Sequence, residues 1–176
     1  MRVAIGIDPG SGKSSPTGFA AIDPDTKTLI FKQNVRMDCD DFAHRIKGIS
    51  SEVADLVSSV DPDIEVNVYI ESFVMRGKGG EMLARLTGAL MACIPYERQI
   101  AFVHNTTMKK DIAGHGRAEK EEVANALFIW AEGNSETQEE ITNLTIAREW
   151  DILDAIGLAV AGDRKRQESL CNCSEA

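Results

Sequence analysis

Four acidic side chains occur where an apolar segment would ordinarily continue, and their positions suggest chemistry. Asp8 ends the apolar run at residues 3–8, and Glu71 ends the apolar segment at 66–71. Asp151 and Asp154 are three residues apart in a segment that predicts a buried helix, so they share one helix face. A buried carboxylate is costly unless something compensates its charge. The four residues are therefore candidates for one functional site.

A divalent cation would compensate these charges. Clustered carboxylates repel one another, and without a cation one or more would take up a proton. Mg²⁺ prefers oxygen ligands. Two such ions about 4 Å apart can activate a water and stabilise the leaving oxygen in phosphodiester cleavage. We therefore expect Asp8, Glu71, Asp151 and Asp154 to be both catalytic and metal-binding, with two Mg²⁺ ions per active site and Mn²⁺ able to substitute.

Each carboxylate also has an ordinary interpretation when it is taken alone. Asp8-Pro9-Gly10 could be a turn, and Glu71 could simply end a strand. Asp151 could be a first-turn charge that the helix dipole favours. Asp154 fits such an explanation least well, because it lies one turn into a very apolar helix. The joint occurrence of all four favours the metal site.

Basic residues concentrate in the middle of an otherwise acidic chain. The 176 residues carry a net charge of −9, which taken alone argues against nucleic acid. Residues 76–120, however, hold 8 basic and 4 acidic side chains, a local charge of +4. Screening limits electrostatic interactions to roughly 8 Å at physiological salt, so local charge decides whether a phosphate backbone can dock. A chance cluster of solvated charges is the alternative.

Apolar patterning predicts the elements that must position these residues. Strands are expected at residues 3–8, 17–23, 28–35, 66–71 and 99–104, and helices at 41–60, 81–94, 120–131 and 150–161. The segments 77–80 and 133–143 are expected to be loops. This order indicates an α/β fold with a mixed sheet. We expect one domain over residues 1–166, followed by a loose tail over 167–176.

Other parts of the sequence bear on location and assembly. No apolar run is long enough to span a membrane, and no signal peptide is evident, so we expect a cytoplasmic protein. Cys93 lies in an apolar run and is expected to be buried and reduced, whereas Cys171 and Cys173 are expected to be free thiols in the tail. The helix at 81–94 is apolar around more than half its circumference, which predicts a second buried face and a homodimer. The stripe comprises Met82, Leu83, Leu86, Leu90 and Met91, with Gly88 and Ala89 allowing close approach.

Four short blocks of sequence run in a fixed order between residues 3 and 161. They are DPG at 8–10 with TG at 17–18; IE at 70–71; MKK at 108–110 with GHG at 114–116 and AEK at 118–120; and WDILDA at 150–155. As a set they resemble the motifs of the RuvC family of Holliday junction resolvases. The resemblance implies an RNase H-like fold, a five-stranded mixed sheet flanked by helices. It also implies a homodimer that nicks two strands of a four-way DNA junction, an activity of recombination and repair.

The resemblance implies roles for individual residues as well. The four carboxylates match the metal-binding catalytic positions, and Lys109 and Lys120 match basic positions that contact DNA near the active site. The aromatic that stacks on a junction base in the family falls on Val74, beside Phe73. The expected DNA-binding residues are therefore Lys109, Lys120, Arg76, Lys78, Lys110, Arg117 and Phe73.

The sequence also departs from the family pattern, so we consider other substrates and other functions as alternatives. The loop at 11–16 is longer than usual, and the segment 121–176 is strongly acidic, which suggests a divergent member, such as one from a phage. The same metal site would serve an RNase H-like nuclease that acts on flaps, forks or RNA–DNA hybrids. A nucleic-acid-binding module without catalysis is a lower-ranked alternative. A sugar-kinase or actin-like phosphate binder would need two such domains, for which 176 residues are too few.

Overall fold

A single mixed sheet forms the centre of the molecule. The computed structural model describes residues 1–10, 15–72 and 77–173, without the side chains of 77–79 and 173. The strands are β1 (Arg2–Asp8), β2 (Thr17–Asp23), β3 (Thr28–Val35), β4 (Glu65–Ser72) and β5 (Gln99–His104). Their order is β3-β2-β1-β4-β5. The first three strands are antiparallel neighbours, whereas β4 and β5 run parallel to β1. The predicted mixed α/β sheet is confirmed.

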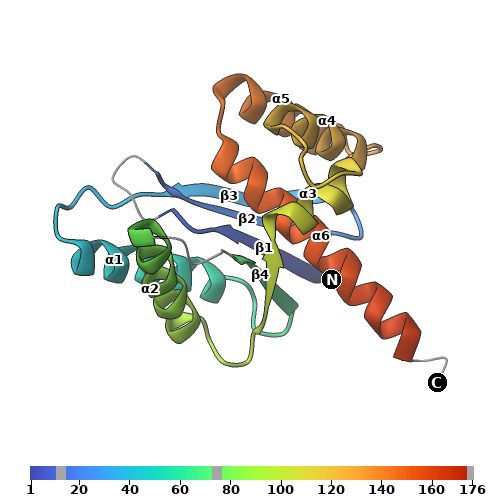
Figure 1. Ribbon diagram of the computed structural model, residues 1–176. Coiled ribbons are helices and arrows are strands. Elements are labelled where there is room, and N and C mark those ends of the chain that lie inside the picture. Colours follow the sequence, from blue (N-terminus) through green and yellow to red (C-terminus); the bar gives the residue numbers. More distant parts are fainter. Residues whose placement is uncertain (11–14, 73–76, 174–176) are drawn as a thin grey trace.

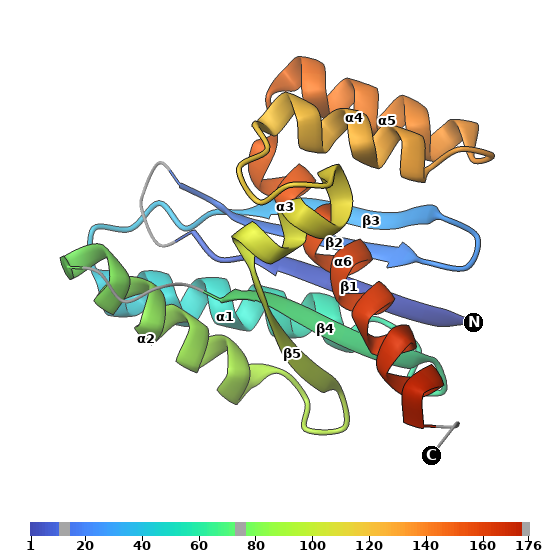
Figure 2. The ribbon, with the colours of Figure 1, turned by 45° about the vertical axis from the view of Figure 1, so that its right-hand side comes forward.

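Helices cover both faces of this sheet (Figure 1). They are α1 (Phe42–Ser58), α2 (Gly77–Cys93), α3 (Asn105–Ala113), α4 (Lys120–Trp130), α5 (Ser135–Ala147) and α6 (Trp150–Cys173). Figure 2 shows α1 and α2 on one face and α6 running across the other, with α4 and α5 beyond it. No helix in the ranges that the structure describes is long and apolar enough to cross a membrane.

The alternation of side chains along β1 explains the two layers. Val3, Ile5 and Ile7 point to one face, where they are buried with Leu86 and Leu90 of α2. Ala4 points to the other face and joins the core that α6 forms with α3, α4 and α5. Alternate residues of a strand share one face, so Gly6 and Asp8 lie on the same face as Ala4. Asp8 is therefore on the face that α6 covers.

Two expected loops are helical, and one helix was not predicted. The segment expected to be a loop at 133–143 lies largely in α5, where the Asn134 side chain accepts from the Thr137 amide and caps the helix. Only Thr137, Ile141 and Leu144 of α5 are buried, so its apolar stripe is narrow. The unpredicted α3 buries Met108 alone. The segment expected to be a loop at 77–80 is the first turn of α2.

The last helix is longer than predicted. Helix α6 continues past the expected end at residue 161 to Cys173, although its last turns are largely exposed. Arg166 holds the extension to the sheet, since its guanidinium bonds Glu65 Oε1 at 2.8 Å and the side chain of Gln99. Arg164 donates to the carbonyl oxygen of Asp111 at 3.1 Å. Charged contacts, rather than an apolar stripe, fix this part of the helix. The proposed division between a domain at 1–166 and a tail at 167–176 stays a prediction.

Candidate active site

Asp8 and Glu71 lie side by side because they stand at the carboxyl ends of adjacent parallel strands, Asp8 last in β1 and Glu71 next to last in β4. Ile7 on β1 pairs with Ile70 on β4, and the two acidic residues follow directly. Asp8 also lies opposite Gly18 on β2. A hydrogen bond joins the side chains of Asp8 and Glu71. Two residues 63 positions apart in the chain thus meet at the carboxyl end of the parallel strands.

Two glycines let α6 bring the other two carboxylates to this place. A Cβ atom added to Gly6 would lie 1.8 Å from the carbonyl oxygen of Ala155, and one added to Gly18 would lie 2.0 Å from that of Asp151. The backbone of α6 therefore rests directly on β1 and β2, which no other residue type would permit. Asp151 and Asp154 lie in the first turns of α6, beside the ends of these strands.

The ionisation of these carboxyl groups shows that they share one site. Burial, followed by the hydrogen bond and charge of Glu71 and then by the charges of Asp154 and Asp151, raises the pKa of Asp8 to about 9. Burial raises the pKa of Asp154 to about 6, and the Lys120 ammonium opposes this shift. Burial also raises the pKa of Asp151, opposed by Lys120 and then Arg36. All four expected carboxylates are therefore brought together.

The donor set suits a hard divalent cation. Four carboxylates supply the oxygen ligands that Mg²⁺ prefers. Because its pKa is about 9, the Asp8 carboxyl group holds a proton at neutral pH. A bound cation could supply the same compensating positive charge in place of that proton. Among the described residues, no three acidic, imidazole or thiol groups already stand in an arrangement that could hold a metal ion.

Two predicted lysines lie beside the carboxylates. Lys120 opens α4 and is exposed, with its ammonium 5.8 Å from the centre of the Trp150 ring. Lys109 is half-buried on α3 and donates to the carbonyl oxygen of Ala118 at 2.8 Å, which ties the segment before α4 to α3. The charges of both lysines act on Asp154.

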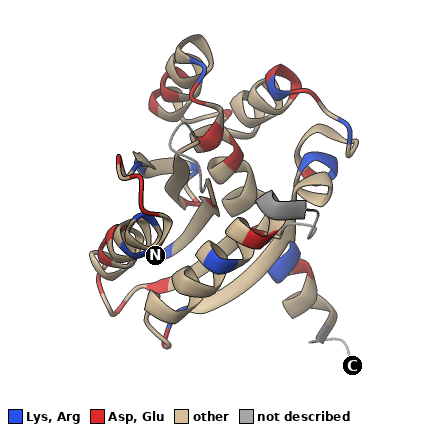
Figure 3. Ribbon diagram, turned by 60° about the vertical axis from the view of Figure 1, so that its left-hand side comes forward, with Lys and Arg blue, Asp and Glu red and all other residues tan. Residues whose placement is uncertain are grey.

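The structure describes the side chains of two of the other predicted DNA-binding residues. Lys110 and Arg117 are exposed, one on α3 and the other before α4. Phe73 and Arg76 lie outside the described residues, as does the side chain of Lys78. Basic and acidic residues are interspersed along the ribbon (Figure 3).

Arg36 was not predicted from the sequence, although it lies near Asp151. It follows the last residue of β3, and Val35 pairs with Thr17 at the start of β2. The side-chain amide of Asn34 also donates to Glu149 Oε2, just before α6. A basic residue directly after the third strand of a meander was the available signal, because that strand ends at the same sheet edge as Asp8.

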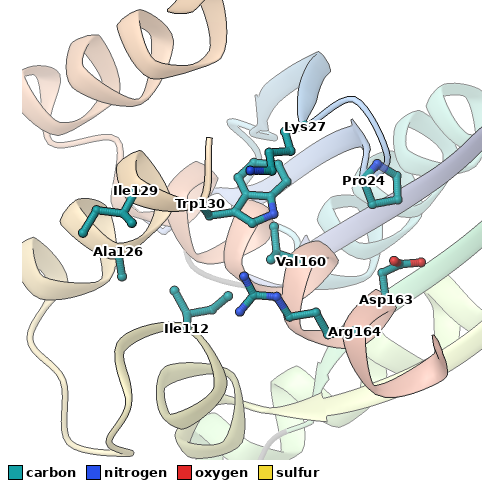
Figure 4. Close-up of a pocket in the computed structure, with 9 residues that line it drawn as sticks. All are labelled: Pro24, Lys27, Ile112, Ala126, Ile129, Trp130, Val160, Asp163 and Arg164. Carbon is teal, nitrogen blue, oxygen red and sulfur yellow. The ribbon is translucent and has the colours of Figure 1, made fainter. Parts of the chain in front are cut away.

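A cavity of about 530 Å³ lies elsewhere, between α3, α4 and α6 (Figure 4). Its Asp163 is twelve residues after Asp151, about 18 Å along the helix axis. The charged groups of its lining are already engaged: Lys27 donates to the Glu132 carbonyl, Arg164 to the Asp111 carbonyl, and Asp163 pairs with Arg2. The carboxylate cluster remains the stronger candidate site.

Comparisons with known proteins agree with this geometry. The family model described as crossover junction endodeoxyribonuclease RuvC matches residues 4–161. The RuvC protein of Shewanella woodyi is 26% identical over 166 residues, covering 91% of this chain and 86% of that protein. The RuvC protein of Salinibacter ruber is 29% identical over 127 residues, covering 69% of this chain and 68% of its own.

Two solved structures share the fold. The Thermus thermophilus RuvC structure has a TM-score of 0.62 at 20% identity and covers 95% of this chain and 96% of that chain. The same protein in complex with a Holliday junction substrate has a TM-score of 0.64 at 20% identity and covers 92% of each chain. The predicted RNase H-like fold is confirmed.

Proposed function

The chain belongs to the RuvC family of crossover junction endodeoxyribonucleases, and we propose that it cleaves phosphodiester bonds in four-way DNA junctions at the carboxylate cluster. The convergence of Asp8, Glu71, Asp151 and Asp154 carries the proposal, because a divalent cation would compensate their charges. We infer two Mg²⁺ ions per site, with Mn²⁺ able to substitute. The cytoplasmic location stays a prediction.

The residues of this chain would divide the work. Asp8 and Glu71, fixed on neighbouring strands, would hold the metal ions together with Asp154 and Asp151 from α6. When bound, the ions would supply an activated water and stabilise the leaving oxygen. Lys120 is exposed beside Asp154 and would hold a phosphate of the cleaved strand. Lys109 would keep Lys120 in place through its bond to the Ala118 carbonyl.

The homodimer is part of this proposal. A four-way junction has two equivalent scissile phosphates related by a two-fold axis, so one site per chain calls for a two-fold pair of chains. The residues of the predicted apolar stripe on α2 differ in their burial. Leu86 and Leu90 pack in the chain's own core, whereas Met91 is 45% exposed. Cys93, which was expected to be buried, is also exposed, so that expectation was wrong.

The test is a panel of matched substrates with one common duplex sequence: a four-way junction, a flap, a fork and an RNA–DNA hybrid. We expect Mg²⁺-dependent paired nicks in the junction that EDTA abolishes. Asp163→Asn is a matched control for Asp154→Asn, because both aspartates lie on α6 but only Asp154 belongs to the cluster. Preferential cleavage of flaps, forks or hybrids would contradict the junction assignment while retaining the metal site. Binding without cleavage of any substrate would favour a nucleic-acid-binding module.

A further inference from the structure

Arg36 is held at the acidic site by the way in which the end of β3 meets the start of α6. Gly18 on β2 pairs with Asn34 on β3, and the space where a Gly18 side chain would lie is occupied by the Asp151 carbonyl. The amide of Asn34 donates to the carboxylate of Glu149, two residues before Asp151. The chain that leads to Arg36 is therefore fixed against the segment that carries Asp151.

The Arg36 guanidinium remains available to a ligand. Arg36 is exposed, and among the residues that the structure describes no carboxylate lies within ion-pair distance of it. Val35, the residue before Arg36, pairs with Thr17 at the start of β2, next to Gly18, on which the Asp151 carbonyl rests. A guanidinium carries five donors in a planar fork that matches the oxygens of a phosphate.

Basic side chains from three elements border the carboxylates. Lys109 is bonded to the Ala118 carbonyl, Lys120 lies over the Trp150 ring next to Asp151, and Arg36 follows the strand that pairs with the start of β2. They come from α3, from the start of α4 and from the end of β3. A nucleic-acid strand presents phosphates at regular intervals, and a row of basic side chains from separate elements suits such a polyanion.

We propose that Arg36 is a phosphate-binding residue that holds the substrate strand at the end of β3, beside the carboxylate cluster. This rests on the proposed nuclease function and extends it, because it assigns to the end of β3 a part of the DNA-binding surface outside residues 76–120. A strand bound at both Lys120 and Arg36 would be held at two points beside the first turn of α6, which carries Asp151.

The test compares Arg36→Gln, which keeps most of the side-chain length but removes the charge, with Arg36→Lys, which keeps the charge. Lys47→Gln is the matched control, because Lys47 is exposed on α1, on the opposite face of the sheet. Binding of a four-way junction is measured in EDTA from low to moderate salt, and cleavage is measured separately in Mg²⁺.

We expect Arg36→Gln to weaken binding roughly two- to fivefold at low salt and to reduce the slope of log K against log salt by about 0.9. Arg36→Lys should recover the slope, and Lys47→Gln should match the unsubstituted protein. If Arg36→Gln and Lys47→Gln have the same affinity and slope while the unsubstituted protein cleaves the junction, the role of Arg36 is overturned and the nuclease function stands. If the unsubstituted protein cleaves no nucleic acid, the proposed function itself fails.

Discussion

At the scale of single residues, the site is a set of carboxyl groups that the fold holds together at a cost. Asp8 and Asp154 are largely removed from water, and burial is the main cause of their raised pKa values. Such groups weaken a folded protein unless a proton or a cation balances them. Their persistence in the core of the site is best explained by the chemistry that they perform.

Replacing Asp8 or Asp154 by Asn should abolish cleavage while leaving the fold and junction binding largely intact. Each change keeps the side-chain shape and removes one charge that would hold the metal ions. Single-turnover cleavage in Mg²⁺ measures the first effect, and binding in EDTA measures the second. Near-normal turnover by both variants, at equal folded fractions, would exclude these residues from the catalytic site.

The stability of the metal-free protein should depend on pH in an unusual direction. The pKa of Asp8 is about 9 in the folded protein against 3.8 for an unperturbed Asp, so between these values the folded state keeps a proton that the unfolded chain releases. The free energy of unfolding should therefore fall as pH rises through this window, and Asp154 adds to the fall up to about pH 6. Thermal unfolding in EDTA from pH 5.5 to 8.5 measures it.

Mg²⁺ should oppose that loss, because it replaces the proton and binds the folded state alone. The increase in Tm on adding Mg²⁺ should thus be larger at pH 8.5 than at pH 5.5. In EDTA at the higher pH, Asp8→Asn should be more stable than the unsubstituted protein by about 1–3 kcal/mol. An equal Mg²⁺ effect at both pH values would argue against a cation at these carboxylates.

The two lysines should differ in what their removal does. Lys120 is exposed, so Lys120→Ala should lower the salt slope of junction binding by about 0.9. Lys109 also bonds the Ala118 carbonyl, so Lys109→Ala should disturb Lys120, and the effects of the two changes on binding should not add. Lys47→Ala serves as the control. Unchanged salt slopes in both variants would mean that Lys109 and Lys120 are ordinary solvated charges that do not contact DNA phosphates.

Most of the site could be predicted because several carboxylates break apolar segments of the same chain. Asp8 and Glu71 end apolar runs and Asp154 interrupts an apolar helix, so their joint occurrence pointed to one site although each residue alone has an ordinary interpretation. Arg36 does not stand out in its own segment, since an Arg after a strand is ordinary, and the signal lay only in the meander, whose third strand ends at the same sheet edge as Asp8. Its place depends on the pairing of Asn34 with Gly18 and on the packing of α6 against that glycine.

At the scale of elements, the close approach of α6 to β1 and β2 makes the site. Gly6→Ala would place a methyl group 1.8 Å from the Ala155 carbonyl, so helix or strand must move. We expect a loss of about 2–3 kcal/mol in the free energy of unfolding. Cleavage should fall further than the folded fraction, because Asp151 and Asp154 move with α6.

Gly157→Ala is the matched control on the same helix. Its added Cβ would meet the Sδ atom of Met108 at 2.8 Å, and a flexible Met side chain can shift where a backbone carbonyl cannot. We expect a smaller loss of stability, with cleavage preserved. Denaturant unfolding and single-turnover assays compare the two. Equal effects of the two substitutions would mean that the contact at Gly6 does not position the carboxylates.

The elements that the sequence did not predict are those whose stability comes from tertiary contacts. Helix α5 has few buried side chains, and its contacts with β3 include a bond from the Leu29 amide to Thr137 Oγ1 at 3.0 Å and an ion pair between Lys32 and Glu140. A narrow apolar stripe in a polar segment gives little periodic signal. The five strands, by contrast, were predicted to within a residue, because their apolar runs are short and clearly bounded.

At the scale of the whole molecule, the outer side of α2 is the candidate surface for assembly. Met91 is 45% exposed, and a Cβ atom added to Gly88 would meet nothing within 4 Å among the described residues. Exposed apolar side chains that occur singly need no explanation. Here Met91 and Gly88 belong to the helix that supplies Leu86 and Leu90 to the core. The proposed reaction also calls for two sites related by a two-fold axis.

We predict that this face of α2 forms the homodimer and that Met91→Glu disrupts it. A charge buried at a two-fold interface would meet its own copy and lose its hydration, so the monomer should predominate at micromolar concentration. Ile146→Glu is the control, because Ile146 is 77% exposed on α5, away from α2. Light scattering measures the mass of each protein, alone and with a junction.

Two further measurements distinguish a loss of assembly from a loss of folding: the stability of each variant, and whether it makes single or paired nicks in a junction. If Met91→Glu acts only on assembly, it should keep its fold and still make single nicks, but lose the paired nicks that resolve a junction. Gly88→Ala refines the test, since in a free monomer it should stabilise α2 by roughly 0.5–1 kcal/mol. In a closely packed dimer it should instead weaken association. A protein that stays monomeric both alone and on a junction would contradict the two-fold arrangement, and a nuclease of flaps or hybrids would then explain the site better.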